Sequence, residues 1–200
     1  MKIFKALVGS AIFVLVLLNI YYIHISYFKV DVVFYAAIFD CIVAALIAGG
    51  LISTASFFKP LGNFEKFQLV IIWLIAGYAF AISVPTVIDR SLSFYILEKI
   101  QQRGGGIRQD AFEKVFTEEY IKEHRLVDVR LTEQLQSGTI IIKNGCVLLT
   151  EKGDSLASFG RYYRKNWLPK QRLLMGKYSD DLTNPFRATL PSPGYECDNE

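Results

Sequence analysis

SLSFYILEKIQQRGGGI (residues 91–107) opens the stretch that decides the architecture of this chain. The stretch continues with DAFEKVFTEEYIKEH (110–124), RLVDVRLTEQLQSG (125–138), TIIIKNGCVLLTEKG (139–153) and DSLASFGRYYRKNW (154–167). Apolar residues at helical spacing, such as Val127, Leu131 and Leu135, predict a helix in each of the first three segments and in the last. The glycine run 104–106 is expected to end the first helix, because glycine adopts the left-handed C-cap conformation without strain.

A hairpin is predicted between the third and the last of these helices. Two β-rich runs, 139–142 and 146–149, flank Asn144-Gly145. Asn-Gly between such runs is a strong signal for a two-residue hairpin turn. With Ile107 as a one-residue strand, the predicted order is helix, short strand, helix, helix, hairpin, helix.

This order resembles the winged-helix fold, in which the third helix leads through Leu-x-x-Gly-x-Ile into a wing closed by Leu-Thr-x-Lys-Gly. The matching residues here are Leu135, Gly138 and Ile140, then Leu149, Thr150, Lys152 and Gly153. The resemblance covers about 75 residues. It implies a recognition-helix surface formed by Arg125, Asp128, Arg130, Glu133 and Gln134.

The charge of that surface bears on what the resemblance implies. Winged-helix proteins commonly bind DNA through the third helix, and DNA affinity depends on clustered Lys and Arg. The charges of residues 125–133 cancel. Winged-helix modules also bind proteins, and the neutral surface fits that use at least as well.

The N-terminal half is expected to lie in a membrane. Of the 22 Lys and Arg residues of the chain, only five precede residue 87. Three apolar stretches, 6–28, 32–58 and 67–88, are long enough to span a bilayer core about 30 Å thick. We therefore predict a mainly α protein: a three-helix membrane region (1–90), a small α+β winged-helix-like domain (91–170) and an irregular tail (171–200).

Asp40 is the only formal charge of the second predicted span. Ionisable groups in membrane helices usually face protein or water. Asp40 could therefore handle a proton, an ion or a partner. The interpretation that we favour is a neutral carboxyl group hydrogen-bonded to a neighbouring helix, with Asn19 as the candidate partner.

The orientation signals conflict. Lys2 and Lys5 against Lys29 predict a cytoplasmic N-terminus, whereas the four basic residues of 90–108 against Lys59 and Lys66 predict a cytoplasmic C-terminal domain. Three spans place the two termini on opposite sides, so both cannot hold. We expect a multi-pass inner-membrane protein with a cytoplasmic C-terminal domain, where winged-helix modules are commoner.

A basic cluster follows the predicted wing. It is a candidate contact for anionic lipid or phosphate and comprises Arg161, Arg164, Lys165, Lys170 and Arg172. Aromatic residues such as Tyr162, Tyr163 and Trp167 are interleaved with it. A solvated helix face is the alternative.

No catalytic, cofactor or metal motif is expected. The three cysteines, Cys41, Cys146 and Cys197, are odd in number and scattered, which gives neither a disulfide framework nor metal-ligand spacing. Cys146 is expected to be a buried apolar thiol. The nearest approach to a metal or acid–base cluster is Glu119, Glu123, His124 and Asp128, which we expect to be solvated charges.

The function expected from these features is that of a non-enzymatic, membrane-anchored accessory or scaffold protein. Its winged-helix-like module would bind a membrane or soluble protein partner, with cell-envelope or glycoconjugate assembly as the expected setting. The alternative is a membrane-bound winged-helix transcription regulator that binds DNA, although nucleic acid is not the partner that we favour. Proton or ion handling through Asp40 is a third hypothesis.

Overall fold

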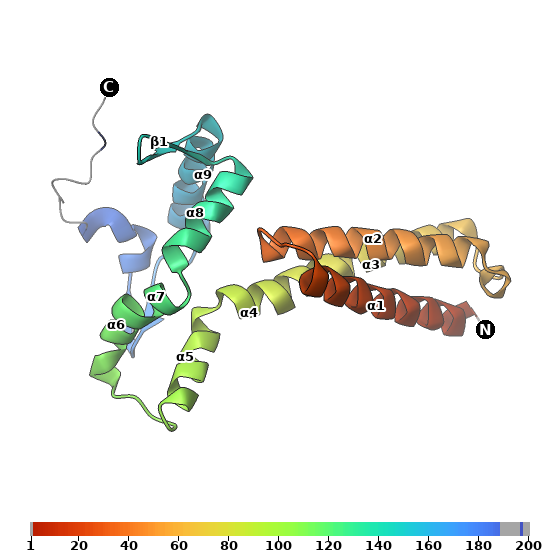
Figure 1. The fold of residues 1–200 in the computed structure, drawn as a ribbon, viewed down its shortest axis with the longest axis horizontal. Coiled ribbons are helices and arrows are strands. Elements are labelled where there is room, and N and C mark those ends of the chain that lie inside the picture. Colours follow the sequence, from red (N-terminus) through yellow and green to blue (C-terminus); the bar gives the residue numbers. More distant parts are fainter. Residues whose placement is uncertain (1, 189–196, 198–200) are drawn as a thin grey trace. The chain divides into compact units, whose positions relative to one another are not determined.

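The computed structural model describes residues 2–188 and 197 and is mainly helical (Figure 1). Its first three helices are α1 (Lys2–Tyr27), α2 (Val33–Thr54) and α3 (Asn63–Ala81), with the 3-10 turn η1 (Ser56–Phe58) between α2 and α3. By length and composition, three helical segments could cross a membrane, namely Lys2–Tyr27, Val33–Thr54 and Asn63–Arg90. The three predicted spans are therefore confirmed as helices of the required length and apolarity.

The third segment continues past Pro85 without a break. Pro85 lies in a π-helical turn, η2 (Ile82–Thr86), which leads directly into α4 (Val87–Arg90). Proline has no backbone N–H to donate, and a π-turn is one of the ways in which a helix accommodates a local disruption of its hydrogen-bond ladder.

Helix α2 packs against both α1 and α3, and the three lie side by side (Figure 1). Its buried face consists mainly of small residues: Ala37, Cys41, Ala44, Ala45 and Ala48. Cys41 meets Gly77 of α3, and its Sγ donates a hydrogen bond to the Gly77 carbonyl oxygen over 3.1 Å. Small side chains let helix backbones approach closely inside a membrane, where dispersion contacts drive association.

The chain divides into two compact units after Leu126. Beyond the long helices, the first unit contains α5 (Leu92–Gln102), η3 (Gln109–Ala111), α6 (Phe112–Lys114), η4 (Val115–Tyr120) and α7 (Ile121–Glu123). Residues 112–123 form one continuous helical segment, which confirms the second predicted helix. Ile107 is not a strand: its side chain packs on the cluster of Tyr95, Val115 and Tyr120, and its backbone is irregular.

The second unit contains α8 (Leu126–Ser137), β1 (Ile140–Lys143), β2 (Cys146–Leu149), α9 (Glu151–Trp167), β3 (Arg172–Leu174), β4 (Lys177–Ser179), η5 (Asp181–Thr183) and η6 (Pro185–Ala188). The predicted hairpin is confirmed, with Lys143 opposite Cys146. Asn144 (φ 50°) and Gly145 (φ 80°) form the turn.

Two features of the second unit were not expected. Residues 172–179 form a second antiparallel hairpin, β3–β4, in the segment predicted to be irregular. Its turn is Met175-Gly176, where both residues have positive φ. The start of α9 lies so close to the β1–β2 hairpin that a Cβ at Gly153 would be 2.0 Å from the Thr139 carbonyl oxygen, so this position requires glycine.

Replacing Gly77 by alanine tests the close packing of α2 and α3. The added Cβ would lie 2.8 Å from the Cys41 Cβ, and overpacking of this kind typically costs about 1–3 kcal/mol. We expect Gly77→Ala to lower the unfolding midpoint of the full-length protein in detergent. Gly50→Ala, whose Cβ would meet nothing within 4 Å, is the matched control and should leave the midpoint unchanged or slightly raised. Equal midpoints for the two variants would contradict this packing.

Candidate functional site

Asp40 lies inside the three-helix region and is paired with a residue of α1. Its side chain is only 1% exposed, and its Oδ1 lies 2.7 Å from Nδ1 of His24, which is 23% exposed. The other carboxylate oxygen, Oδ2, has no hydrogen-bond partner among the described residues. The predicted partner is wrong: Asn19 instead donates its side-chain amide to the Leu15 carbonyl oxygen of its own helix.

The net charge of the His24–Asp40 pair determines what it costs to place it inside a membrane. A histidine and a carboxylate that share one proton form a net neutral pair, which costs less in hydrocarbon than a lone carboxylate. A cavity of about 250 Å³ adjoins the pair and is otherwise lined by apolar side chains, including Ile20 and Phe39. Asp40 is the only buried charged residue in the described parts of the spans. These residues therefore link α1 to α2, and no series of buried acids crosses the described spans.

A second polar cluster lies where α5 meets the helical segment 112–123. Lys99 of α5 is 4% exposed, and its Nζ lies 2.6 Å from Glu119 and 2.6 Å from Glu123. The Tyr95 hydroxyl donates to Glu123 over 2.9 Å, and Arg103 donates to both oxygens of Glu119. One buried lysine therefore holds two glutamates that are four residues apart.

These contacts shift the protonation equilibria of the cluster. Hydrogen bonds from Lys99, with help from Arg103, hold the pKa of Glu119 below its usual range. Hydrogen bonds from Lys99 and Tyr95 do the same to the pKa of Glu123. The two glutamates in turn raise the pKa of Lys99. Burial, with the hydrogen bond to Glu123, raises the pKa of Tyr95. All three charged groups are therefore held in their ionised forms near neutral pH.

The expected solvated cluster is thus only partly correct. Glu119 and Glu123 share a face, but they are ion-paired rather than simply solvated. The His124 ring packs against the rings of Tyr95 and Tyr120, with centroids 5.2 and 4.9 Å away. Arg125, with φ 44°, separates this segment from α8, which carries Asp128. Within residues 2–188 and 197, no three His, Cys, Asp or Glu side chains gather as metal ligands.

Several polar residues of the predicted recognition-helix surface form ion pairs or hydrogen bonds within the chain. Arg130 pairs with Glu133 three residues later, at 2.9 Å. Gln134 accepts hydrogen bonds from Thr139 at both its backbone carbonyl and its side-chain oxygen. The Arg130–Glu133 pair lies within α8, whereas Gln134 fastens α8 to the residue before the hairpin.

The predicted basic cluster is exposed as a whole. Arg161, Arg164 and Lys165 lie on α9, and Lys170 and Arg172 follow it. Arg161 donates to Ser158 over 3.2 Å. None of the five forms an ion pair with an acidic side chain of the described residues.

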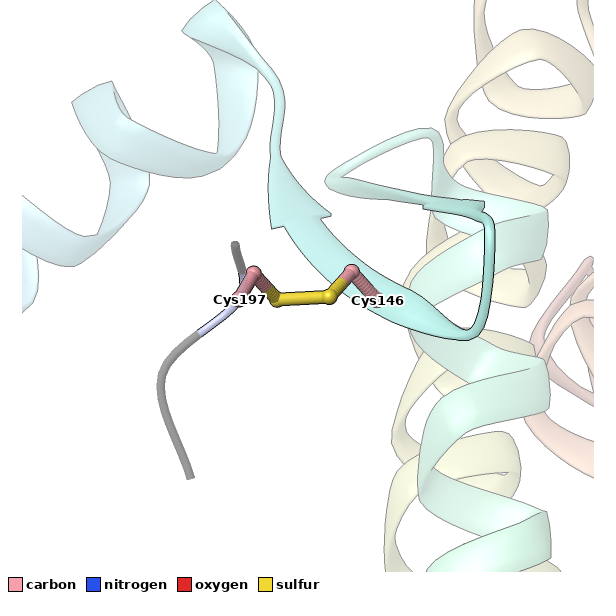
Figure 2. Close-up of a disulfide and its surroundings, with 2 residues drawn as sticks. All are labelled: Cys146 and Cys197. Carbon is pink, nitrogen blue, oxygen red and sulfur yellow. A yellow bond between two sulfur atoms is a disulfide. The ribbon is translucent and has the colours of Figure 1, made fainter. Parts of the chain in front are cut away.

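A disulfide joins Cys146 of β2 to Cys197 (Figure 2), with a Cα–Cα distance of 6.0 Å and a sequence separation of 51. The expectations of no disulfide and of a free apolar thiol at Cys146 are therefore wrong. Cys41 is free and buried in α2. Without Cys41, two cysteines remain, and an even number is the sequence signal for a disulfide. The total of three cysteines hid this signal.

No family model, curated protein or solved structure matches this chain. The winged-helix resemblance therefore stays a prediction that rests on the quoted motif and on the order of elements.

The Lys99 cluster predicts a loss of local stability in acid. The folded-state pKa values of Glu119 and Glu123 are lowered, so their contribution is present above the unfolded value of about 4.3 and disappears as the pH falls through the folded values. The raised pKa of Lys99 makes its contribution present below about pH 10.4. Hydrogen exchange of the α5 amides, corrected for the intrinsic rate at each pH, should show full protection near neutral pH and loss below about pH 4.

Lys99→Met should reduce this protection at neutral pH and flatten its acid dependence. Arg108→Met, which removes an exposed pair with Asp110, is the control and should behave like the wild type. An equally steep acid loss in Lys99→Met would show that other groups control it.

Proposed function

We propose that this chain is a non-enzymatic accessory protein, anchored in a membrane by α1–α3, whose C-terminal unit binds a protein partner through the β1–β2 hairpin. The observation that carries the proposal is the exposure of that hairpin. Its apolar residues Ile141, Ile142, Val147, Leu148 and Leu149 are 37–61% exposed.

Exposure affects both faces of the hairpin. Successive side chains of a strand point to opposite faces, and exposed apolar residues follow one another along both strands. Ile140 is the only strongly buried residue of the two strands. Among the described residues, β1 and β2 pair only with each other, so each keeps one unpaired edge. A two-stranded hairpin of this kind is marginally stable by itself.

A protein fits this surface better than DNA does. Strand edges present backbone donors and acceptors that another polypeptide strand can pair with. Lys143 is the only charged residue of the two strands, whereas phosphate contacts need several cations.

The winged-helix-like character of residues 91–170 is part of the proposal. The order α5, the segment 112–123, α8, β1–β2 and α9 supports it, with the hairpin as the wing. In this arrangement the wing and not α8 is the binding element, because Arg130, Glu133 and Gln134 are engaged within the chain.

The disulfide is evidence for the compartment in which the C-terminal unit lies. Disulfides persist in oxidising compartments and are rare in the cytosol, so the Cys146–Cys197 bond supports a C-terminal unit outside the cytoplasm. This proposal reverses the orientation expected from the charges of residues 90–108. Those charges belong to a long C-terminal region, and long domains translocate largely regardless of charge.

The short loops support the same orientation. Lys2 binds Glu65 at 2.9 Å, and Lys5 donates to the Phe57 carbonyl oxygen over 2.6 Å. The start of α1 and the α2–α3 connection therefore lie at one end of the bundle, together with Lys59 and Lys66. The α1–α2 loop at the other end has only Lys29. By the positive-inside rule the lysine-rich end is cytoplasmic, and an inner membrane with a role in envelope assembly stays part of the proposal.

A membrane-bound DNA-binding regulator is the alternative, and it requires a cytoplasmic C-terminal unit. Its motivation is the winged-helix-like order of elements together with the basic residues of α9. The orientation experiment below separates it from our proposal.

A reporter enzyme that is active only outside the cytoplasm tests the orientation. Fused after Glu200 it should be active, because three spans carry the chain across the membrane an odd number of times. Fused after Gly62, in the α2–α3 connection, it should be inactive. The opposite pattern would refute the proposed orientation and reopen the DNA-binding alternative.

A photo-crosslinking amino acid at Ile142 tests the partner. In whole cells it should give one protein adduct of defined mass. The adduct should weaken when Leu148 is replaced by glutamate, because a buried charge disrupts an apolar interface. The same probe at the exposed residue Arg108 is the control and should give no such adduct. Lipid adducts only, or the same adducts from both positions, would refute protein binding by the hairpin.

A further inference from the structure

The segment after the first hairpin combines positive charge with exposed aromatic residues. Residues 155–179 contain six Lys and Arg residues and no Asp or Glu: Arg161, Arg164, Lys165, Lys170, Arg172 and Lys177. Within the described residues, none of the six forms an ion pair with an acidic side chain. The proposed partner contact does not use them.

Helix α9 carries its exposed apolar and aromatic residues on one side, and its basic residues lie at the edge of that side or opposite it. Leu156, Phe159, Tyr163 and Trp167 recur at intervals of three and four residues, so they form one stripe, and they are 45–67% exposed. The rings of Phe159, Tyr163 and Trp167 follow one another with centroids 5.9 and 6.5 Å apart. At 100° per residue, Arg161 and Lys165 lie on the opposite side of the helix, and Arg164 lies at the boundary between the two sides. Beyond Gly153 every residue of α9 is at least partly exposed.

The β3–β4 hairpin also combines exposed apolar side chains with basic residues. Met175 at its turn is 84% exposed, and the cross-strand neighbours Leu173 and Tyr178 are 58% and 70% exposed. Arg172 and Lys177 lie on the same two strands.

We infer that α9 and the β3–β4 hairpin together form a peripheral membrane-binding surface that lies on an anionic phospholipid bilayer. An amphipathic helix with Trp, Phe and Leu on one face and Lys and Arg on the other is the usual form of an interfacial helix. Tyrosine and tryptophan prefer the headgroup level. Charge complementarity selects anionic lipid, because the segment offers six cations and no acid of its own.

Anchoring makes this contact easy to form. Helix α9 belongs to the same chain as α4, the end of the third candidate membrane segment. The surface is therefore tethered to a bilayer and can dock without a separate diffusional encounter. The inference rests on the membrane anchoring in the proposed function but not on its protein partner or its orientation.

Tryptophan fluorescence of the full-length protein tests the inference. The chain has two tryptophans, Trp73 in α3 and Trp167 in α9, so Trp73→Phe leaves Trp167 as the only reporter. The protein is reconstituted into vesicles of phosphatidylcholine, alone or mixed with phosphatidylglycerol, whose acyl chains carry bromine as a quencher. We expect quenching and a blue shift of Trp167 in the anionic vesicles, both reversed at about 1 M salt, where the Debye length is about 3 Å.

Charge variants give the size of the effect. Each Lys or Arg near an anionic membrane surface strengthens the binding of the protein to that surface about fivefold. The combined variant Arg161→Gln, Arg164→Gln and Lys165→Gln should therefore lower the ratio of docked to free α9 about a hundredfold. Arg108→Gln, at an exposed position outside α9 and both hairpins, is the control and should leave the ratio unchanged. If Trp73→Phe does not fold, the difference between the wild-type protein and Trp167→Phe isolates the same signal.

The outcomes separate the alternatives. Equal quenching in neutral and anionic vesicles would refute charge-selected docking. A water-exposed Trp167 in both would refute membrane contact. Protection of Trp167 in lipid-free detergent would show that another part of the protein covers the stripe, and would also overturn the inference. Loss of the Ile142 crosslink with Trp167 quenching intact would refute the partner proposal alone.

Discussion

The close approach of α2 to its two neighbours is the interaction on which the three-helix region depends. Inside a bilayer, lipid tails are as apolar as the side chains, so helices associate by contact rather than by escape from water. The alanines of α2 and the Cys41–Gly77 contact provide this close packing. The same packing brings α1 against α2, and without it Asp40 would face hydrocarbon with no histidine beside it.

The second unit is held together by different means. Apart from Gly153, only Thr139 and Ile140 are strongly buried among its described residues. Backbone pairing in two hairpins, the tight crossing at Gly153 and the Cys146–Cys197 bond provide its organisation. A disulfide stabilises mainly by restricting the unfolded chain, which suits a unit with so small a core. Its large apolar side chains are consequently left at the surface, where they are available for binding.

Local signals in the sequence predicted much of this fold. The absence of charge over about 20 residues identified the spans, and Asn144-Gly145 identified the first hairpin, because each signal depends only on neighbouring residues. Met175-Gly176 also takes positive φ at its turn, but the flanking strands have only three residues each, and such short runs give little β pattern. Lys99 could not be connected to Glu119 and Glu123 from sequence alone, since that contact depends on how two helices pack.

The faces of α1 explain why His24, and not Asn19, is the partner of Asp40. Asn19 lies eight residues before the end of α1 and Asp40 seven residues after the start of α2, so the two are at matching depth. Depth does not fix the face of a helix, however. The buried residues of α1 are Gly9, Phe13 and Leu17, and His24 follows Leu17 by two helical turns on the same stripe. Asn19 lies off this stripe, so helical periodicity, and not depth, would have favoured His24.

Charged residues of the first unit and of residues 155–179 differ in whether they are paired within the chain. The two buried charges of the first unit are both paired, Asp40 with His24 and Lys99 with two glutamates. Charges that are engaged inside a fold contribute to its organisation and leave little attraction for a ligand. Residues 155–179 show the opposite arrangement, with six cations and no acid beside an exposed aromatic stripe. An anionic surface would neutralise these cations and cover the stripe in one contact, and for this reason we propose that α9 and β3–β4 bind such a surface.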